Sequence, residues 1–343
     1  MRRAFLAVIV LALAIMGAGC PCVRSAVNAS PELRWWLFAN FGASKICPEM
    51  LKRGVPLKLP ALGLGNASVG RFFPNQCNVQ VDDARKAIVM SASGTGYLTL
   101  PLTRRVGFYV GMSVEYLPDF RLEADETYVW GKFSRFVSQP DMRIVGVENP
   151  VVSLATRTPA GDVATVIGNG LVASEIGRGF TVVRQADGDD FTLGYLEPPQ
   201  KPKRQFKTGA ERVVLGSDLT AIYPQSRDYL GPFEITDNNA ALFVRAKTEP
   251  TPLTFSVVDR SVGEAWRRLY EGAQPMAAAP GPLLAQGTLA VGETSLRFPL
   301  QPGTYYVVVE NQAAAPFAPL GVPLPVPEQP AYLSYSVEIG NAN

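Results

Sequence analysis

Residues 106–116 carry the strongest folding constraint in this chain, because apolar side chains occupy every second position. A period of two places alternate side chains on opposite faces of a β-strand. One face is small or polar (Gly107, Tyr109, Gly111, Ser113, Glu115), and the other is apolar (Val106, Phe108, Val110, Met112, Val114, Tyr116). A run this long, backed by glycines, predicts a strongly curved sheet that wraps a core or a cavity.

Similar but shorter segments occur on both sides of this run. In the N-terminal half we expect strands at Asn78–Val81, Ala87–Ser91, Gly96–Pro101, Thr127–Phe136 and Met142–Glu148. In the C-terminal half we expect them at Arg212–Leu215, Thr220–Tyr223, Gly231–Thr236, Ala241–Lys247, Leu253–Asp259, Leu283–Leu289, Ser295–Pro299, Thr304–Glu310 and Ala331–Ile339. Short strands separated by turn residues indicate an antiparallel β-sandwich.

A charged, proline-rich stretch at 197–207 separates the two halves, and we interpret it as a linker. Its basic cluster, Lys201 to Arg204, is interpreted as a solvated part of that linker. The fold class predicted is therefore mainly β with some α. An N-terminal α+β domain with a curved antiparallel sheet spans 30–196, and a C-terminal antiparallel β-sandwich spans 208–343.

Helix signals precede the first strands. Ser30, Pro31 and Glu32 form a helix start, and Gly42 marks its expected end. The helix is apolar nearly all round, so Trp35, Trp36, Phe38 and Phe41 are either packed against the β-domain or lie on a membrane or partner surface.

Three further helices are expected. A short one spans Pro48–Arg53, and an amphipathic one spans Ala160–Ile176 and lies against the curved sheet. The third spans Ala265–Glu271, where Ser261 and Glu264 form a capping box and Gly272 ends the helix.

The N-terminus has the form of an export signal. Arg2 and Arg3 precede an apolar run at 4–16, which is shorter than a membrane-spanning helix needs to be. Small residues at 17–19 then lead to Cys20. We assign residues 1–19 to the signal peptide and 20–29 to a tether.

The small residues before Cys20 resemble the lipobox of bacterial lipoproteins, although Gly17 stands where leucine is usual. The resemblance implies cleavage before Cys20 and acylation of that cysteine, so that several acyl chains anchor the protein. Because Pro21 is not aspartate, it also implies delivery to the outer membrane, on its periplasmic or surface face. The alternative is ordinary cleavage near Ala18, or between Ala26 and Ala29, which releases a soluble secreted protein.

Export exposes the cysteines to an oxidising compartment. Cys47 and Cys77 lie in folded sequence, whereas Cys22 lies in the tether, so we predict a disulfide between Cys47 and Cys77. No CxxC pair or histidine-containing ligand set is present, and no metal site is predicted.

Histidine is absent from the sequence, which excludes Ser-His-Asp and Cys-His catalysis and HExxH zinc sites. Loss of the signal peptide removes Arg2 and Arg3 and no acid, leaving 30 basic and 30 acidic side chains. A chain without basic excess is a poor nucleic-acid binder. We predict no cofactor.

Two local patterns have competing interpretations. Asp187, Gly188, Asp189 and Asp190 lie between two expected strands, Phe180–Arg184 and Phe191–Leu196, and are read as a hairpin turn rather than as a calcium loop. Residues 300–310, which contain Pro-Gly-Thr-Tyr-Tyr, resemble a strand of the small jelly-roll domains appended to secreted bacterial enzymes. That resemblance implies a binding or packing module.

We predict a non-catalytic, lipid-anchored envelope lipoprotein that binds a protein, lipid or polymer partner. Two alternatives remain open. The first is a carrier that encloses an apolar ligand between the curved sheet and the 160–176 helix. The second is a hydrolase that uses two carboxylates, such as Asp82 with Asp83 or Asp119 with Glu123.

Overall fold

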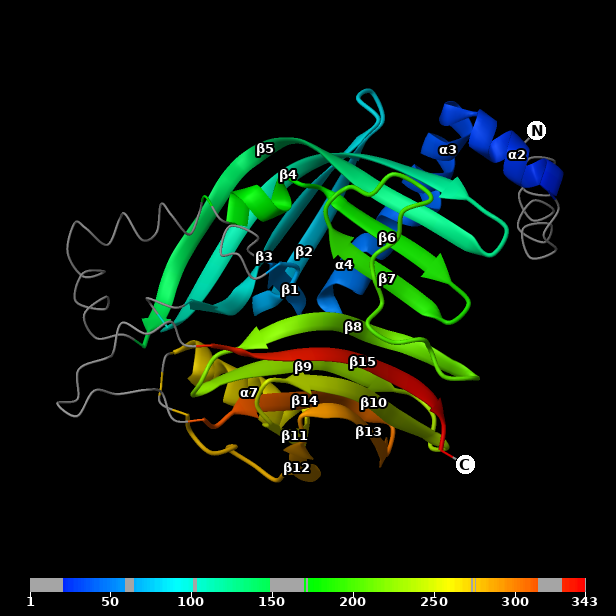
Figure 1. Ribbon diagram of the computed structural model, residues 1–343. Coiled ribbons are helices and arrows are strands. Elements are labelled where there is room, and N and C mark those ends of the chain that lie inside the picture. The colour runs from blue at the N-terminus through cyan, green and yellow to red at the C-terminus, as the bar shows by residue number, and fades with distance from the viewer. Residues whose placement is uncertain are drawn as a thin grey trace, which may run out of the picture.

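The protein is mainly β with some α, as predicted (Figure 1). The structure is a computed structural model that describes residues 21–58, 65–100, 104–148, 170, 172–272, 274, 276–313 and 329–342. A curved sheet with N-terminal helices lies against a two-sheet sandwich, and the two parts share one continuous 11-stranded sheet.

From residue 21, where the described part of the chain begins, to the first strand there are four helical segments: α2 (Pro21–Ala29), α3 (Pro31–Leu37), a π-helical turn η1 (Phe38–Gly42) and α4 (Ala43–Leu51). Ser30 caps α3 as predicted, because its hydroxyl accepts a hydrogen bond from the Leu33 amide. Within the segment assigned to a tether, residues 21–29 form a helix with Val27 buried.

The predicted helix end at Gly42 is also wrong. Gly42 has helical dihedral angles (φ −84°, ψ −48°) and leads directly into α4, which includes Pro48. A Cβ atom at position 42 would lie 3.0 Å from the ring of Phe38. The glycine therefore makes room for a buried aromatic ring and does not terminate the helix.

Among the described residues, seven strands form the curved sheet, and each is hydrogen-bonded antiparallel to the next: β1 (Val55–Lys58), β2 (Ser68–Asp82), β3 (Ala87–Leu100), β4 (Arg104–Leu122), β5 (Glu126–Val147), β6 (Phe180–Gln185) and β7 (Gly188–Leu193). The alternating run at 106–116 lies in β4, and its apolar face is buried from Phe108 to Tyr116. The hairpin predicted at Asp187 joins β6 to β7.

Strands β3 and β5 each merge two of the shorter strands that were expected. Gly94 and Gly96 do not interrupt β3, because they allow a close approach of the neighbouring strand. A Cβ atom at Gly94 would lie 2.2 Å from the carbonyl oxygen of Phe73 on β2. Glycine here permits strong curvature without ending the strand.

Residues 172–176 are helical and pack against the curved sheet through Val172 and Ile176. Most of the helix expected at 160–176 lies outside the described residues.

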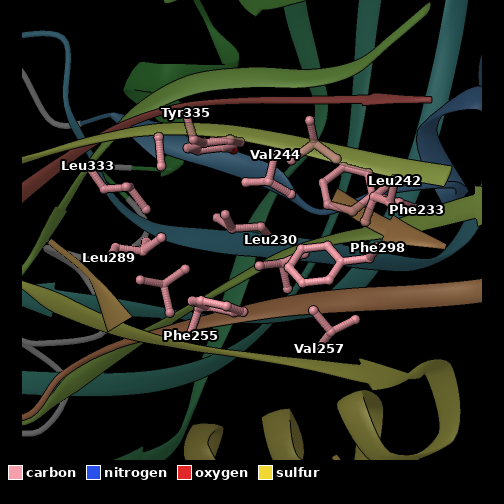
Figure 2. Packing of buried hydrophobic residues seen from close by; sticks show 14 of the residues in the cluster. Leu230, Phe233, Leu242, Val244, Phe255, Val257, Leu289, Phe298, Leu333 and Tyr335 are labelled. Carbon is pink, nitrogen blue, oxygen red and sulfur yellow. The ribbon is translucent and has the colours of Figure 1, made fainter. Parts of the chain in front are cut away.

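Two sheets form the C-terminal sandwich. The first continues the curved sheet and contains β8 (Arg212–Ile222), β15 (Ala331–Asn341), β10 (Ala240–Glu249) and β13 (Gly292–Pro299). The second contains β12 (Ala285–Leu289), β11 (Leu253–Asp259), β14 (Gly303–Asn311) and β9 (Ser226–Ile235). Figure 2 shows the apolar side chains of both sheets, including Leu230, Phe255 and Phe298, packed between them.

Helix α7 (Arg260–Glu271) covers the second sheet. Its N-cap is Asp259 and not Ser261 as predicted. The Asp259 carboxylate accepts hydrogen bonds from the Val262 amide at 2.9 Å and the Ser261 hydroxyl at 2.7 Å, so the serine supports the cap without forming it. Gly272 is the C-cap, as predicted.

Strand β8 joins the two parts of the molecule. It pairs with β15 along its length, and it meets β7 at Gly188–Val214 and β2 at Ser68–Thr220 through single parallel bridges. The domain boundaries proposed from the sequence stay a prediction.

Candidate functional site: an apolar cavity beside β1

Strand β1 lies at the edge of the 11-stranded sheet. Strand β7 pairs fully with β6 on one side but with β8 at only one position on the other side. An apolar cavity of about 30 Å³ lies beside β1. Its lining comes from both β1 and β7, from the inner faces of β2–β4 and from the 172–176 helix: Val55, Leu57, Phe72, Leu98, Phe108, Val110, Met112, Val172, Glu175, Ile176 and Leu193.

Alternation along β4 places Phe108, Val110 and Met112 on the cavity side. Glycine on the next strand makes room for the largest of them. Gly96 pairs with Phe108, and a Cβ atom at Gly96 would lie 2.7 Å from the Phe108 ring. The absence of a side chain at Gly96 thus leaves room for the Phe108 ring.

Glu175 is the one charged side chain that lines the cavity among the described residues, and it is 5% exposed. Burial raises its pKa, and the partly exposed Arg178, at 3.1 Å, opposes this effect without cancelling it. A carboxylate beside an apolar space is costly, because desolvation disfavours its charged form.

Phe191 lies two residues before Leu193 on β7 and therefore on the same face of the strand. It is 42% exposed. An exposed aromatic side chain next to a lining residue extends the apolar surface beyond the cavity. The cavity has the size of a small apolar group, and its lining suits hydrocarbon rather than a polar ligand.

The four aromatic residues proposed as a surface do not share one environment. Phe38 is 4% exposed and belongs to the core of the curved sheet, and Trp35 packs on that core while its indole N–H donates to Asp83. Trp36 and Phe41 contact each other with ring centroids 5.8 Å apart, and Phe41 is 45% exposed. Only Trp36 and Phe41 remain as surface candidates.

The predicted disulfide is confirmed. Cys47 on α4 is bonded to Cys77 on β2, with Cα atoms 5.3 Å apart. The bond attaches the N-terminal helices to the curved sheet. Cys22 is exposed on α2, and Cys20 lies outside the described residues.

The carboxylates proposed for hydrolysis have structural partners. Asp119 forms an ion pair with Arg34 at 2.7 Å, and Glu123 forms one with Arg121 at 2.6 Å. Asp82 accepts a hydrogen bond from the Arg85 amide at 3.1 Å. Within the described ranges, no three acidic or cysteine side chains are grouped as metal ligands would be.

The interpretation of 201–204 as a solvated cluster is wrong for Arg204. Its guanidinium donates to Asp190 at 2.7 Å and to the Thr208 hydroxyl at 2.7 Å, and its side chain is 16% exposed. Burial raises the pKa of Asp190, and Arg204 counteracts this. The arginine therefore attaches the interdomain segment to the β6–β7 hairpin.

Sequence reasoning missed Glu175, Leu193 and the β1 residues Val55 and Leu57 as parts of one site. The sequence contains a partial signal, since Val172 and Ile176 are four residues apart and share a helix face. Their contact with β1 and β7 depends on long-range folding.

None of the helices in the described part of the chain is long and apolar enough to span a membrane. Comparison of the whole sequence with protein-family models and with curated proteins finds no match.

Proposed function

We propose that this protein is an exported envelope lipoprotein, anchored through acylated Cys20, that binds a partner without catalysing a reaction. The Cys47–Cys77 disulfide is the observation that carries this proposal. Disulfides persist in oxidising compartments and are rare in the cytosol, so the bond agrees with the export signal at residues 1–19. The bond also accounts for two of the four cysteines and leaves Cys20 and Cys22 at the N-terminus.

Buried carboxylates form ion pairs within the protein. Asp228, Glu115 and Asp190 are each paired with at least one arginine. Glu115, for example, accepts hydrogen bonds from Arg85 and Arg135 on the outer face of the curved sheet. These arrangements use carboxylate charge to hold strands and loops together, which is a structural role.

Transport of an apolar ligand is a second candidate function, and the cavity beside β1 favours it. The lining is apolar except for Glu175, and Phe191 extends the apolar surface. A cavity of about 30 Å³ fits the end of a hydrocarbon chain, so a longer chain requires β1, β7 or the 172–176 helix to move.

Intact mass spectrometry of protein extracted gently from its native membrane tests both functions. We expect the mass of Cys20–Asn343 plus acyl chains, and a Cys20→Ala variant is expected to lack the acyl mass. A chain that begins beyond Cys20, without modification, would refute the anchor. Extra mass that disappears on denaturation would identify a bound ligand, and the absence of such mass would count against the carrier.

A further inference from the structure

The first described residue, Pro21, already belongs to a helix that is fixed to the curved sheet. Val27 of α2 is 4% exposed in the core. The Asn28 side chain donates to the Leu122 carbonyl at 2.8 Å and accepts from the Leu122 amide at 3.0 Å, which mimics a strand pairing at the end of β4. No flexible spacer therefore separates position 20 from the folded protein.

Helix α3 is fixed in the same way. Arg34 donates from two guanidinium nitrogens to the two carboxylate oxygens of Asp119, at 2.7 and 3.1 Å. Phe38, one turn later, is buried in the core of the curved sheet. The inward face of the helix is thus defined by an ion pair and an aromatic ring.

The outer side of α3 and η1 carries three apolar side chains beside two exposed polar ones, Asn40 and Glu32, of which Glu32 pairs with Lys86. Leu33 is 37% exposed, Phe41 is 45% exposed, and Trp36 lies between them in contact with Phe41. Leu33 and Trp36 are three residues apart on one helix face. We call these three residues the outer α3 patch.

The surroundings of the outer α3 patch suit a bilayer interface. The exposed residues of α2, Cys22, Ser25, Ala26 and Ala29, are uncharged. Lys45 is exposed on α4, one turn after Phe41. Tryptophan with neighbouring apolar and lysine side chains is typical of helices that lie at the level of lipid headgroups.

Geometry places the outer α3 patch close to the proposed anchor. Leu33 is thirteen residues from Cys20, and a largely helical path of that length spans at most about 20 Å. Because α2 and α3 are fixed to the sheet, acyl chains on Cys20 would bring the same face of the protein to the membrane each time.

We infer that the outer α3 patch, formed by Leu33, Trp36 and Phe41, lies in the headgroup layer of the bilayer that holds the acylated Cys20. This inference rests on the proposed lipid anchor. It orients the molecule with α2 and α3 on the membrane.

Fluorescence quenching tests the inference. Lipidated protein is reconstituted into phosphatidylcholine vesicles whose acyl chains carry bromine, and tryptophan emission is compared with that in unbrominated vesicles. We expect strong quenching in the wild type and loss of most of it in Trp36→Phe. Trp130→Phe is the control, because Trp130 lies on β5 against Tyr195 and should contribute little to the quenching.

A second pair of variants tests the contact without removing the fluorophore. Phe41→Glu places a charge in the outer α3 patch and is expected to reduce quenching of Trp36. Leu117→Glu, at a position of β4 that is 44% exposed, is expected to leave quenching unchanged.

The outcomes separate the inference from the proposed function. If the protein does not float with vesicles and carries no acyl mass, the lipid anchor is wrong. If it floats but Trp36→Phe and wild type are quenched equally weakly, the anchor stands and the bilayer contact is refuted. Shielding of Trp36 from an aqueous quencher only in native membranes would instead indicate a protein partner, and would overturn the assignment to lipid.

Discussion

The Arg71 guanidinium on β2 and the Asp228 carboxylate on β9 form a two-contact ion pair at 2.7 and 2.9 Å that joins the curved sheet to the sandwich. Both side chains are almost fully buried. The Tyr97 hydroxyl donates to Asp228 at 2.7 Å, and Arg71 also donates to the Tyr335 hydroxyl at 2.9 Å. The hydrogen bonds to both charges offset part of their desolvation.

We expect Asp228→Asn to lower the free energy of unfolding by about 3–5 kcal/mol, because it leaves the Arg71 charge buried without its partner. Urea unfolding measures this change. The double variant Arg71→Met with Asp228→Leu removes both charges and is expected to recover most of the loss. Equal destabilisation by the single and double variants would contradict this account.

The same pair predicts an acid-dependent loss of stability. Burial raises the pKa of Asp228, but the charge of Arg71 and hydrogen bonds from Arg71 and Tyr97 outweigh burial and hold the pKa below its usual value. The contribution of Asp228 is therefore complete above about pH 4, the pKa range of an unfolded aspartate, and is lost as pH falls through the lower folded value. Asp228→Asn should remove this part of the pH dependence.

The Cys47–Cys77 disulfide closes a loop with a sequence separation of 30. On the chain-entropy model we expect reduction, or Cys47→Ala with Cys77→Ala, to lower the free energy of unfolding by about 3–4 kcal/mol. The control is Cys22→Ser at an exposed position of α2, where a surface change should stay within about 0.5 kcal/mol. Denaturant curves with and without reductant provide the measurement.

Phe108→Ala is expected to enlarge the cavity beside β1 and to destabilise the protein by about 3–5 kcal/mol, since Phe108 is fully buried. Because an enlarged apolar cavity stays dry and binds small apolar molecules, benzene should raise the melting temperature of this variant. Leu117→Ala on the same strand should change stability little. No response to benzene would show that the site collapses in the variant.

Glu175→Gln is expected to change the pH dependence in the opposite direction to Asp228→Asn. The pKa of Glu175 is raised by burial, so the folded protein favours its protonated form. Protonated Glu175 contributes its full stabilisation below about pH 4, near the pKa of a glutamate in the unfolded chain. The contribution falls as pH rises through the higher pKa that Glu175 has in the folded protein. The variant should be less sensitive to pH in that range, as measured by unfolding at several pH values, with Glu123→Gln as an exposed control.

Asp259→Ala is expected to destabilise the protein by about 0.5–2 kcal/mol through loss of the α7 N-cap. Ser261→Ala should cost less, because Ser261 contacts the Asp259 side chain rather than a helix amide. If Ser261→Ala destabilised the protein more than Asp259→Ala in thermal unfolding, Ser261 and not Asp259 would be the N-cap, as the sequence pattern predicts.

The N-cap of α7 shows what a local sequence pattern can and cannot predict. Asp259 and Ser261 are two residues apart, both are good N-cap residues, and a pattern cannot decide which one the strand before the helix brings into position. The backbone of Asp259 is extended at the end of β11, and this geometry selects it. Gly42 and Gly96 are further examples. Each glycine looks like the boundary of an element in the sequence, but in the structure it leaves room for an aromatic ring within a continuous helix or strand.

The sequence by itself determined the central strand β4, because the period-two pattern from Val106 to Tyr116 reflects which side chains are buried on one face of a sheet. Its cysteine positions were also sufficient to predict the disulfide. Only the tertiary structure decided that β1, β7 and the 172–176 helix meet around one cavity, and that Arg71 pairs with Asp228. Both arrangements join residues far apart in the chain, and their stability comes from burial and charge pairing that exist only once the sheets have packed.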